Sequence, residues 1–300
     1  MTRRRVDGVL LLDKPSGITS TAALSRVKRL YNAEKAGHTG TLDPLASGLL
    51  PICLGNATRF AGMLLDAPKR YDATIRFGIA TTTYDAEGDI TATHPVTFDE
   101  QRLLEMVGRL TGPQLQVPPA HSALKFEGRP HYEYARAGID VPRPPRHVVI
   151  HAMRLVEWNA PDARVEVECS KGTYIRSLAA RSGEELGCGA HLLALRRTGT
   201  GGFAIAQAIT LEALEALDPS ARDALLLPTA TLVAHLPRIE LGPAAARSFR
   251  HGQQIAVGGV TDLRDSALPA AAFEGHVLLG IAELRNGVLS PRRVLAGDST

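Results

Sequence analysis

The chain has 300 residues, of which 44% are apolar and 22% are charged, and its net charge is +3. This composition is typical of a globular protein with one large domain or two ordinary ones. No apolar stretch approaches the length that crosses a membrane, which excludes a helical membrane protein.

The three cysteines, Cys53, Cys169 and Cys188, are far apart and form no CxxC pair. They predict neither a zinc knuckle nor a disulfide framework, and an odd number fits a reducing compartment. The apolar run after the first basic residues is too short for a secretion signal. We therefore expect a cytoplasmic protein with no membrane partner.

Positive charge is concentrated at the N-terminus, where residues 1–38 hold eight Lys or Arg and three Asp or Glu. Such an excess can attract a phosphate backbone, but it is more often a solvated helix face with a basic tail. Charge alone therefore favours the second interpretation.

Hydrophobic periodicity predicts a mixture of strands and helices. Strands are expected at 8–13, 70–79 and 165–169. One helix is expected to begin at Thr19 or Ser20 and a second to span 56–65. A third should follow residues 97–100 and include Leu110, and a fourth should begin at Thr173. Residues 97–100 are predicted to form a capping box for the third helix. Because strands and helices do not alternate regularly, we expect an α+β fold with a mixed, largely antiparallel sheet flanked by helices.

Residues 118–151 differ from their surroundings. They include six prolines, four of the ten histidines and five Lys or Arg, with one helical piece at 130–137. A basic insertion bounded by prolines usually has a function, and the alternative is a solvent-exposed excursion without one.

The C-terminal part has its own pattern. Residues 218–237 are predicted to connect two units, and Asn286-Gly287 predicts a hairpin turn between strands at 277–284 and 288–295. We therefore expect two domains, at 1–237 and 238–300, of which the second is small and β-rich.

The loop at 37–51 is the first candidate for chemistry, because three glycines and two prolines surround His38 and Asp43. A metal site would need further ligands nearby, and no such spacing occurs. The sequence also has no GxSxG, Walker A or GxGxxG motif, and a two-carboxylate glycosidase would need a partner acid that the sequence does not locate. The structural alternative for Asp43 is a turn before Pro44.

Two basic segments are further candidates. Arg176 is expected in the first turn of a helix, where its charge opposes the helix dipole, so we predict a fixed negative partner, either a phosphate or a carboxylate. Arg196 and Arg197 precede a glycine-rich stretch, and such residues suit a phosphate backbone.

Together these segments resemble the TruB family of bacterial tRNA pseudouridine synthases. The resemblance is carried in order by residues 8–20, 37–48, 69–71, 122–125, 132–136, 169–176 and 187–192. It implies the pseudouridine synthase fold, with a PUA-like C-terminal domain.

The resemblance also implies a site. It makes Asp43 the nucleophile, Arg176 its counter-ion, and Tyr71 the residue that stacks on the base and accepts a proton. The implied substrate-binding residues are His38, Tyr71, Tyr174, Leu195 and Lys14. No metal, nucleotide or organic cofactor is implied.

The implied reaction is isomerisation of uridine 55 in the tRNA T-loop, on a flipped-out nucleotide. The insertion is expected to contact the T-arm and the PUA-like domain the acceptor stem, and we expect a monomer. The alternatives are a non-catalytic RNA-binding or tRNA-chaperone protein on the same scaffold, or a synthase for a different RNA uridine.

Overall fold

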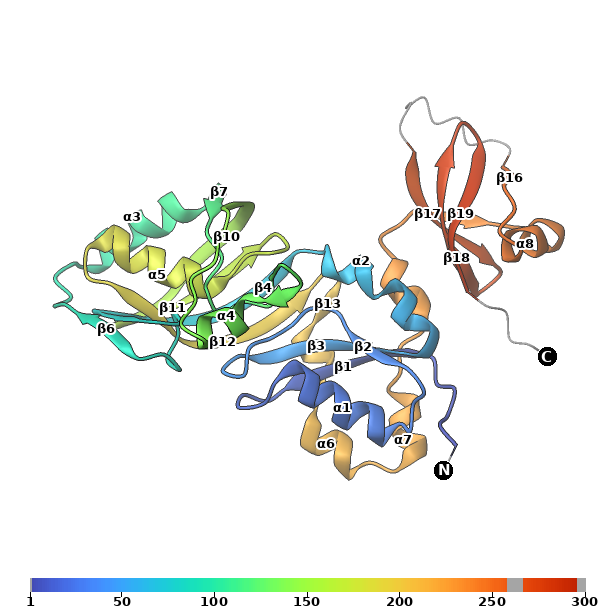
Figure 1. Cartoon of the computed structure of the whole chain (residues 1–300). Helices are drawn as coiled ribbons and strands as arrows, with labels where there is room; N and C mark the ends of the chain where they lie inside the picture. The colour runs from blue at the N-terminus through green and yellow to red at the C-terminus, as the bar shows by residue number, and fades with distance from the viewer. Residues whose placement is uncertain (1, 258–266, 296–300) are drawn as a thin grey trace.

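A computed structural model describes residues 2–257 and 267–295 (Figure 1). Its centre is a ten-stranded sheet with the order β14-β1-β3-β12-β4-β11-β10-β7, in which β2 also pairs with β3 and β13 with β12. The strands are β1 Gly8–Lys14, β2 Ala36–His38, β3 Ser47–Leu54, β4 Lys69–Phe77, β7 Gly112–Gln116, β10 Arg146–Asn159, β11 Asp162–Cys169, β12 Ala190–Thr200, β13 Phe203–Ala204 and β14 Ile209–Thr210.

Most neighbouring strands of this sheet are antiparallel. The two parallel pairs are β1 with β14 and β3 with β12. The expected α+β fold with a largely antiparallel sheet is therefore confirmed. The parallel contact between β3 and β12 matters for function, because it brings the end of the loop before β3 next to the middle of β12.

Helices cover the sheet in two groups (Figure 1). The first group lies beside β1 and β3 and consists of α1 Ser20–Leu30, α6 Leu211–Ala216 and α7 Pro219–Ala224. The second lies beside β10 and β12 and consists of α3 Glu100–Leu110 and α5 Ile175–Leu186. α1 and α6 bury apolar side chains in one core, and α3 and α5 bury theirs in another.

Two helix starts test the capping predictions. Thr19 caps α1, since its side chain accepts a hydrogen bond from the Ala22 amide at 3.0 Å. The capping box expected at 97–100 is wrong, because Asp99 caps α3 by accepting from the Arg102 amide at 2.9 Å. A carboxylate directly before the helix reaches its free amides, so the cap lies two residues later than predicted.

Two further elements differ from the prediction. The segment 56–65 is a 3-10 helix, η1 Gly55–Phe60, followed by the short α2 Ala61–Leu65. The strand predicted at 70–79 ends at Phe77, because Gly78 has a φ of +86° and turns the chain into a separate hairpin. That hairpin pairs β5 Ile79–Thr81 with β6 Ile90–Thr93.

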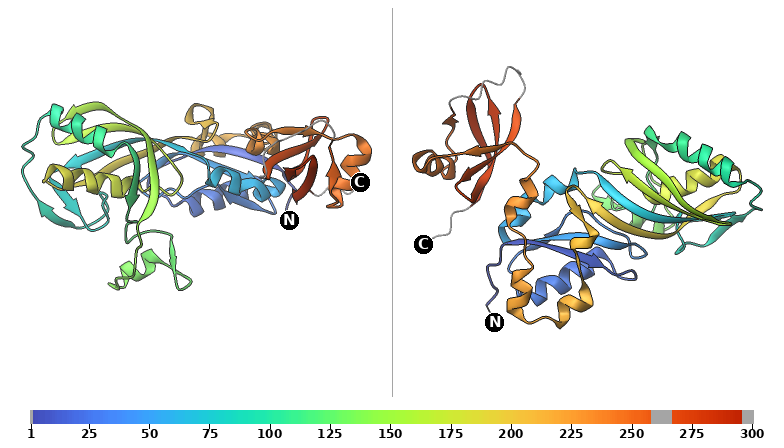
Figure 2. Two further views of the ribbon diagram at one scale, coloured as in Figure 1. Left: turned by 90° about the horizontal axis from the view of Figure 1, so that it is seen from above. Right: turned by 180° about the vertical axis from the view of Figure 1, so that it is seen from behind.

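The expected insertion projects away from the sheet (Figure 2, left). It carries the short hairpin β8 Lys125–Phe126 and β9 Arg129–Pro130, then α4 His131–Arg136. The helical piece expected at 130–137 is confirmed. Residues 146–151 belong instead to β10 of the central sheet, so the projecting part ends earlier than 151.

The segment 218–237 is more than a connection. It contains α7 and the 3-10 helix η3 Thr229–Val233, and it follows a third 3-10 helix, η2 Ile205–Gln207. Leu232 and Val233 are buried in a core that also holds Phe60 and, from the C-terminal part, Phe273. The segment therefore packs against both parts of the chain.

The C-terminal part forms a five-stranded sheet with the order β15-β17-β18-β19-β16. Its elements are β15 Arg238–Glu240, α8 Pro243–Arg250, β16 Ile255–Ala256, β17 Leu268–Glu274, β18 Val277–Arg285 and β19 Val288–Val294. The predicted hairpin is confirmed, with Asn286 and Gly287 both at positive φ between β18 and β19. Of the domain expected at 238–300, residues 258–266 and 296–300 lie outside the described residues.

None of the helices in the described ranges is both long and apolar enough to cross a membrane.

Candidate active site

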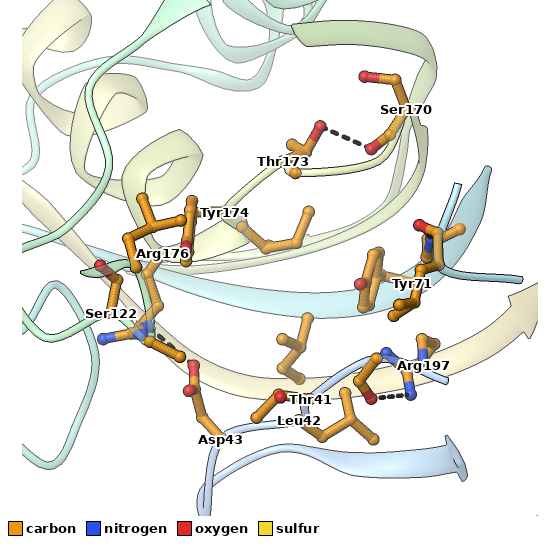
Figure 3. Close-up of a pocket in the computed structure, with 18 residues that line it drawn as sticks. Thr41, Leu42, Asp43, Tyr71, Ser122, Ser170, Thr173, Tyr174, Arg176 and Arg197 are labelled. Carbon is orange, nitrogen blue, oxygen red and sulfur yellow. Dashed lines mark hydrogen bonds and ion pairs between the residues drawn. The ribbon is translucent and has the colours of Figure 1, made fainter. Parts of the chain in front are cut away.

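A pocket of about 310 Å³ opens where the loop before β3, the middle of β12, the start of β4 and the start of α5 meet (Figure 3). Its lining residues include Asp43, Tyr71, Tyr174, Arg176, Leu195 and Arg197. The first five of these were singled out from the sequence as site residues, and the fold brings them together from four separate segments.

The loop that carries Asp43 is fixed at both ends. The Ser20 hydroxyl of α1 donates to the Leu42 carbonyl at 2.9 Å and accepts from the Leu42 amide at 2.8 Å. The Ala46 amide then donates to the Asp43 carbonyl at 3.1 Å, closing a turn. Gly48 has a φ of +100° and lies against the Arg197 backbone, where a Cβ would clash at 2.4 Å. These contacts hold Asp43 at the mouth of the pocket.

Arg176 has the negative partner that its place in a first helical turn predicted. Its Nε lies 2.9 Å from Oδ2 of Asp43, and its Nη1 lies 3.5 Å from Oδ2 of Asp85. The guanidinium also donates to the His121 carbonyl at 2.8 Å and to the Thr83 carbonyl at 3.4 Å. The Arg176 side chain is only 6% exposed. One buried cation is therefore shared by two carboxylates.

The charge on Asp43 is opposed by its surroundings. Although 39% of its side chain is exposed to the pocket, the dense protein around it removes solvent and raises the pKa of its carboxyl. Arg176 opposes this rise, and the nearby charge of Asp85 adds to it. The pKa of the Asp43 carboxyl is therefore raised overall, and the positive charges of Arg176 and, more weakly, Lys14 limit the rise.

Tyr71 lies at the opposite end of the pocket from Asp43 (Figure 3). It belongs to β4, where it pairs with Val167 of β11 on one side and with Arg197 of β12 on the other. Burial raises the pKa of its phenol, and the charge of Arg197 opposes that rise. At neutral pH the side chain is therefore a neutral phenol.

Tyr174 and Leu195 form apolar walls of the pocket. The backbone of Tyr174 is fixed by Gln116, whose amide accepts from its N–H at 2.8 Å and donates to its carbonyl at 3.1 Å. Burial raises the pKa of the Tyr174 phenol. Leu195 pairs with Ala73 across β12 and β4 and contacts both cores of the central sheet.

His38 and Lys14 do not line the pocket. Lys14 is fully buried, its Nζ donates to the carbonyls of Pro15 and Ile18 at 2.8 and 2.7 Å, and burial lowers its pKa to about 8. His38 lies in β2 opposite Ile52, half-buried, and burial lowers the pKa of its imidazole. Lys14 thus holds the turn between β1 and α1, and its charge lowers the pKa of Asp43.

The sequence reasoning missed three parts of the site. Asp85 and Gln116 gave no signal, because each is a single polar residue whose partner lies far along the chain. Arg197 was noticed for the wrong reason: it does not face a phosphate backbone but is 1% exposed and donates to the carbonyls of Leu49 and Gly40 at 2.7 and 3.1 Å. Its neighbour Arg196 instead pairs with Asp13 at 2.6 Å.

A second cavity of about 640 Å³ lies on the other side of the Asp43–Arg176 pair. It extends to Tyr132 and Arg136 of the projecting insertion. The ion pair therefore stands between a small pocket and a wider space beneath the insertion. In the part of the chain that is described, no three His, Cys, Asp or Glu side chains are grouped as a metal site would require.

Three family models match nearly the whole chain. Residues 28–175 match the TruB family pseudouridylate synthase (N terminal domain), and residues 176–234 match the tRNA pseudouridylate synthase B C-terminal domain. Residues 237–295 match the model named Pseudouridine synthase II TruB, C-terminal.

Named relatives and solved structures agree with these matches. The tRNA pseudouridine synthase B of Thiobacillus denitrificans is 52% identical over 98% of this chain and 97% of its own length. That of Burkholderia mallei is 51% identical over 98% of this chain and 99% of its own length.

Among solved structures, a crystal structure of a Cbf5-Nop10-Gar1 complex superposes with a TM-score of 0.72 at 27% identity, covering 96% of this chain and 84% of the matched chain. The structure of an H/ACA RNP bound to a substrate RNA containing 2'-deoxyuridine superposes with a TM-score of 0.70 at 26% identity, covering 96% of this chain and 84% of the matched chain. The chain therefore belongs to the TruB family of pseudouridylate synthases.

Proposed function

We propose that this protein converts uridine 55 in the T-loop of tRNA to pseudouridine. The observation that carries the proposal is the ion pair of Asp43 with the buried Arg176, at 2.9 Å, at the mouth of a pocket large enough for one base. The printed names of its relatives, tRNA pseudouridine synthase B, support the tRNA substrate.

Asp43 is proposed as the nucleophile. An ionised carboxylate in a partly desolvated site is reactive, and the charge of Arg176 favours its ionised form against the effect of burial. The carboxylate forms a covalent adduct with the bound nucleotide while the bond between N1 of uracil and C1′ of the ribose breaks. The uracil turns, and its C5 bonds to C1′ as the bond between the nucleotide and the Asp43 carboxylate breaks, which frees the carboxylate. Substrate and product are isomers, so no hydrolytic water and no second carboxylate acting as a base are needed.

Tyr71 is proposed to stack on the uracil and to accept the proton that leaves C5. It lines the same pocket as Asp43 but at the opposite end, which leaves space for a base between them (Figure 3). Tyr174 and Leu195 would enclose the ring on its apolar sides. A base can enter such a pocket only after it has left its stack, as for other enzymes that act on nucleobases.

The residues outside the pocket have proposed roles that follow from their positions. Lys14 holds the turn between β1 and α1 through the Pro15 and Ile18 carbonyls, and it is proposed to serve the substrate site through its charge, which lowers the pKa of Asp43. His38, half-buried at the edge of this loop, is proposed to contact RNA beside the flipped nucleotide.

The insertion is proposed to contact the T-arm. It carries two arginine–tyrosine stacks: Arg129 of β9 lies over Tyr134 of α4 at 4.8 Å, and Arg136 lies over Tyr132 within α4 at 5.5 Å. Such pairs suit unstacked bases and phosphates. Arg136 also lines the wider cavity next to the Asp43–Arg176 pair, which would connect this surface to the reacting nucleotide.

The C-terminal domain, at 238–300, is proposed to reach the acceptor stem, and the catalytic domain to span 1–237. We also propose that the protein acts as a monomer in the cytoplasm. A tRNA substrate and three buried free cysteines support that compartment.

One experiment tests the activity. An unmodified tRNA transcript is incubated with the pure protein, and pseudouridine is measured by position. Pseudouridine at position 55 is expected, and a transcript with cytidine at position 55 should give none. Tight binding without pseudouridine would favour the non-catalytic alternative, and pseudouridine elsewhere would favour a synthase for another uridine.

A further inference from the structure

Arg197 is a buried cation without a carboxylate partner among the described residues. It is 1% exposed, and its hydrogen bonds go to the backbone carbonyls of Leu49 and Gly40. Buried guanidinium groups are normally paired, because an uncompensated charge away from water is unfavourable. The protein nevertheless holds this one at the wall of the pocket, which indicates that its charge has a use there.

Tyr71 is the side chain on which the charge of Arg197 can act. The two residues are direct cross-strand partners of β4 and β12, so their side chains leave the sheet on the same face. Both line the pocket, and Figure 3 shows them together at the end away from Asp43. Arg197 also bonds to Gly40 and Leu49 on either side of the Asp43 loop, so it links that loop to the strand of Tyr71.

The electrostatics at this end of the pocket favour an anion. Lys69, whose Nζ donates to the carbonyls of Leu64, Leu65 and Ala67, also lines the pocket next to Tyr71. Burial lowers the pKa of Lys69 to about 8, and the charge of Arg197 adds to this decrease, so two cations share this small volume. The same charge opposes the rise that burial imposes on the pKa of the Tyr71 phenol.

We propose that Arg197 is a positioning residue that orients the Tyr71 phenol and stabilises the phenolate that takes the C5 proton. This inference rests on the proposed function. Tyr71 is a neutral phenol at neutral pH, so its proton first passes to N1 of the rearranged uracil, whose bond to C1′ has been broken, and this leaves the phenolate. The C5–H bond then breaks and the proton passes to the phenolate oxygen, which restores the neutral phenol. The electron pair of that bond restores the double bond between C5 and C6 of the ring. A neutral phenol is a weak base, so the step needs a group that makes the phenolate accessible.

The test separates charge from packing with two substitutions. Arg197→Gln removes the charge but keeps an amide that can donate to a carbonyl, whereas Arg197→Lys keeps the charge without the planar fork. Arg196→Gln is the matched control, because this neighbour lies on the same strand and pairs with Asp13 instead. Folding of each full-length variant is checked by circular dichroism and thermal unfolding.

The first measurement needs no RNA. A fluorinated tyrosine at position 71, which ionises at lower pH than tyrosine, is titrated by ¹⁹F NMR in each variant. Arg197→Gln should raise the pH of half-ionisation by about one unit, a tenfold loss of phenolate at fixed pH. Arg197→Lys should shift it less, and Arg196→Gln should leave it unchanged.

The second measurement is single-turnover formation of pseudouridine. Arg197→Gln should slow it about tenfold or more, Arg197→Lys should recover part of the rate, and tRNA affinity should stay within about twofold. In a Tyr71→Phe background, Arg197→Gln should cause no further loss.

Three results would overturn the proposal. The first is a slowed Arg197→Gln variant with an unchanged titration at position 71. The second is an additional loss in the Tyr71→Phe background. The third is failure of both Arg197 variants to fold while Arg196→Gln folds, which would assign Arg197 to stability alone. If the titration shifts but even the parent protein makes no pseudouridine, the coupling of the two residues stands and the proposed function fails.

Discussion

The guanidinium of Arg176 lies between two carboxylates, with Nε 2.9 Å from Oδ2 of Asp43 and Nη1 3.5 Å from Oδ2 of Asp85. The two acids differ in exposure: the Asp85 side chain is 4% exposed, whereas 39% of the Asp43 side chain is open to the pocket. Asp85 is therefore placed to hold Arg176, and Arg176 is placed to keep Asp43 ionised where a substrate can reach it.

Asp43→Asn should abolish turnover and leave tRNA affinity nearly intact. The amide has almost the same shape but cannot act as an anionic nucleophile. Product is measured in single-turnover assays and affinity by filter binding, with mass spectrometry to verify that the amide has not deamidated. Pseudouridine formation by the Asp43→Asn variant with its amide intact would rule out the nucleophile role.

The same substitution should not destabilise the fold. Folding raises the pKa of Asp43, so its ionised form lowers stability in full above the folded pKa. This loss shrinks as the pH falls through the folded pKa and is gone below the ordinary value of 3.8. An asparagine side chain carries no charge and avoids the loss. Thermal unfolding at pH 7 should give a Tm for Asp43→Asn equal to or above the parent value. A clear decrease would indicate that the ion pair stabilises the protein despite the raised pKa.

Arg176→Ala should lose turnover by about a hundredfold or more and should also be less stable. It leaves Asp85 buried without a cation, which typically costs about 3–5 kcal/mol. Arg176→Lys should be impaired as well, because a point charge does not replace a planar fork that contacts four groups. Arg181→Ala is the control, since this arginine lies on the same helix but is exposed and bonds only to Gln114. Normal turnover in both Arg176 variants would show that the pairing is not used.

Turnover should fall as the pH falls through the pKa of Asp43, at a higher pH than its ordinary value of 3.8 would give. Arg176 lowers this pKa, so its removal should move the acidic limb to still higher pH, while Arg176→Lys should move it less. Single-turnover rates at saturating tRNA, measured across the acidic range, give the acidic side of the pH–rate profile directly. An acidic limb at the same pH in Arg176→Ala and in the parent would contradict the proposed coupling.

The sequence predicted the parts of the site that local patterns carry. The glycine- and proline-rich loop marked Asp43, the alternation of β4 placed Tyr71 on a buried face, and the dipole argument required a negative partner for Arg176. Each of these signals lies within one short segment of the chain. The resemblance then connected the segments, which periodicity alone could not do.

What the sequence could not predict depends on contacts between distant segments. Asp85 and Gln116 act through partners elsewhere in the fold, and nothing in their own neighbourhood marks them. Arg196 and Arg197 are adjacent and of the same type, yet the pleat of β12 sends the first to Asp13 and the second into the pocket wall. Because neighbouring residues of a strand point to opposite faces, Arg196 forms an ion pair and Arg197 is a buried cation. The register of β12 with β4 decides which of the two arginines faces the pocket.

Deleting residues 238–300 should weaken tRNA binding but leave activity on an isolated T-arm hairpin, which lacks the acceptor stem. The deletion also removes Phe273 from a core shared with Leu232 and Val233, so its effect on stability must be measured separately. Thermal unfolding and activity on both substrates give the comparison. Equal losses on tRNA and hairpin would indicate that the C-terminal part supports the catalytic fold.

Tyr71→Phe tests the last chemical step. Phe keeps the ring, so capture of the base should survive, but it removes the phenol proposed to take the C5 proton. Cleavage of the glycosidic bond requires Asp43 and not this phenol, so the early steps should still run. The variant should stall late, with rearranged but still-protonated base accumulating and product slowed by roughly a hundredfold or more. Tyr174→Phe is the matched control, because it removes a phenol from the same pocket and should leave this step unchanged. Single-turnover kinetics with uridine deuterated at C5 resolve the step, since only loss of this deuteron should be slowed. Product release by Tyr71→Phe at the parent rate would mean that the proton leaves by another route.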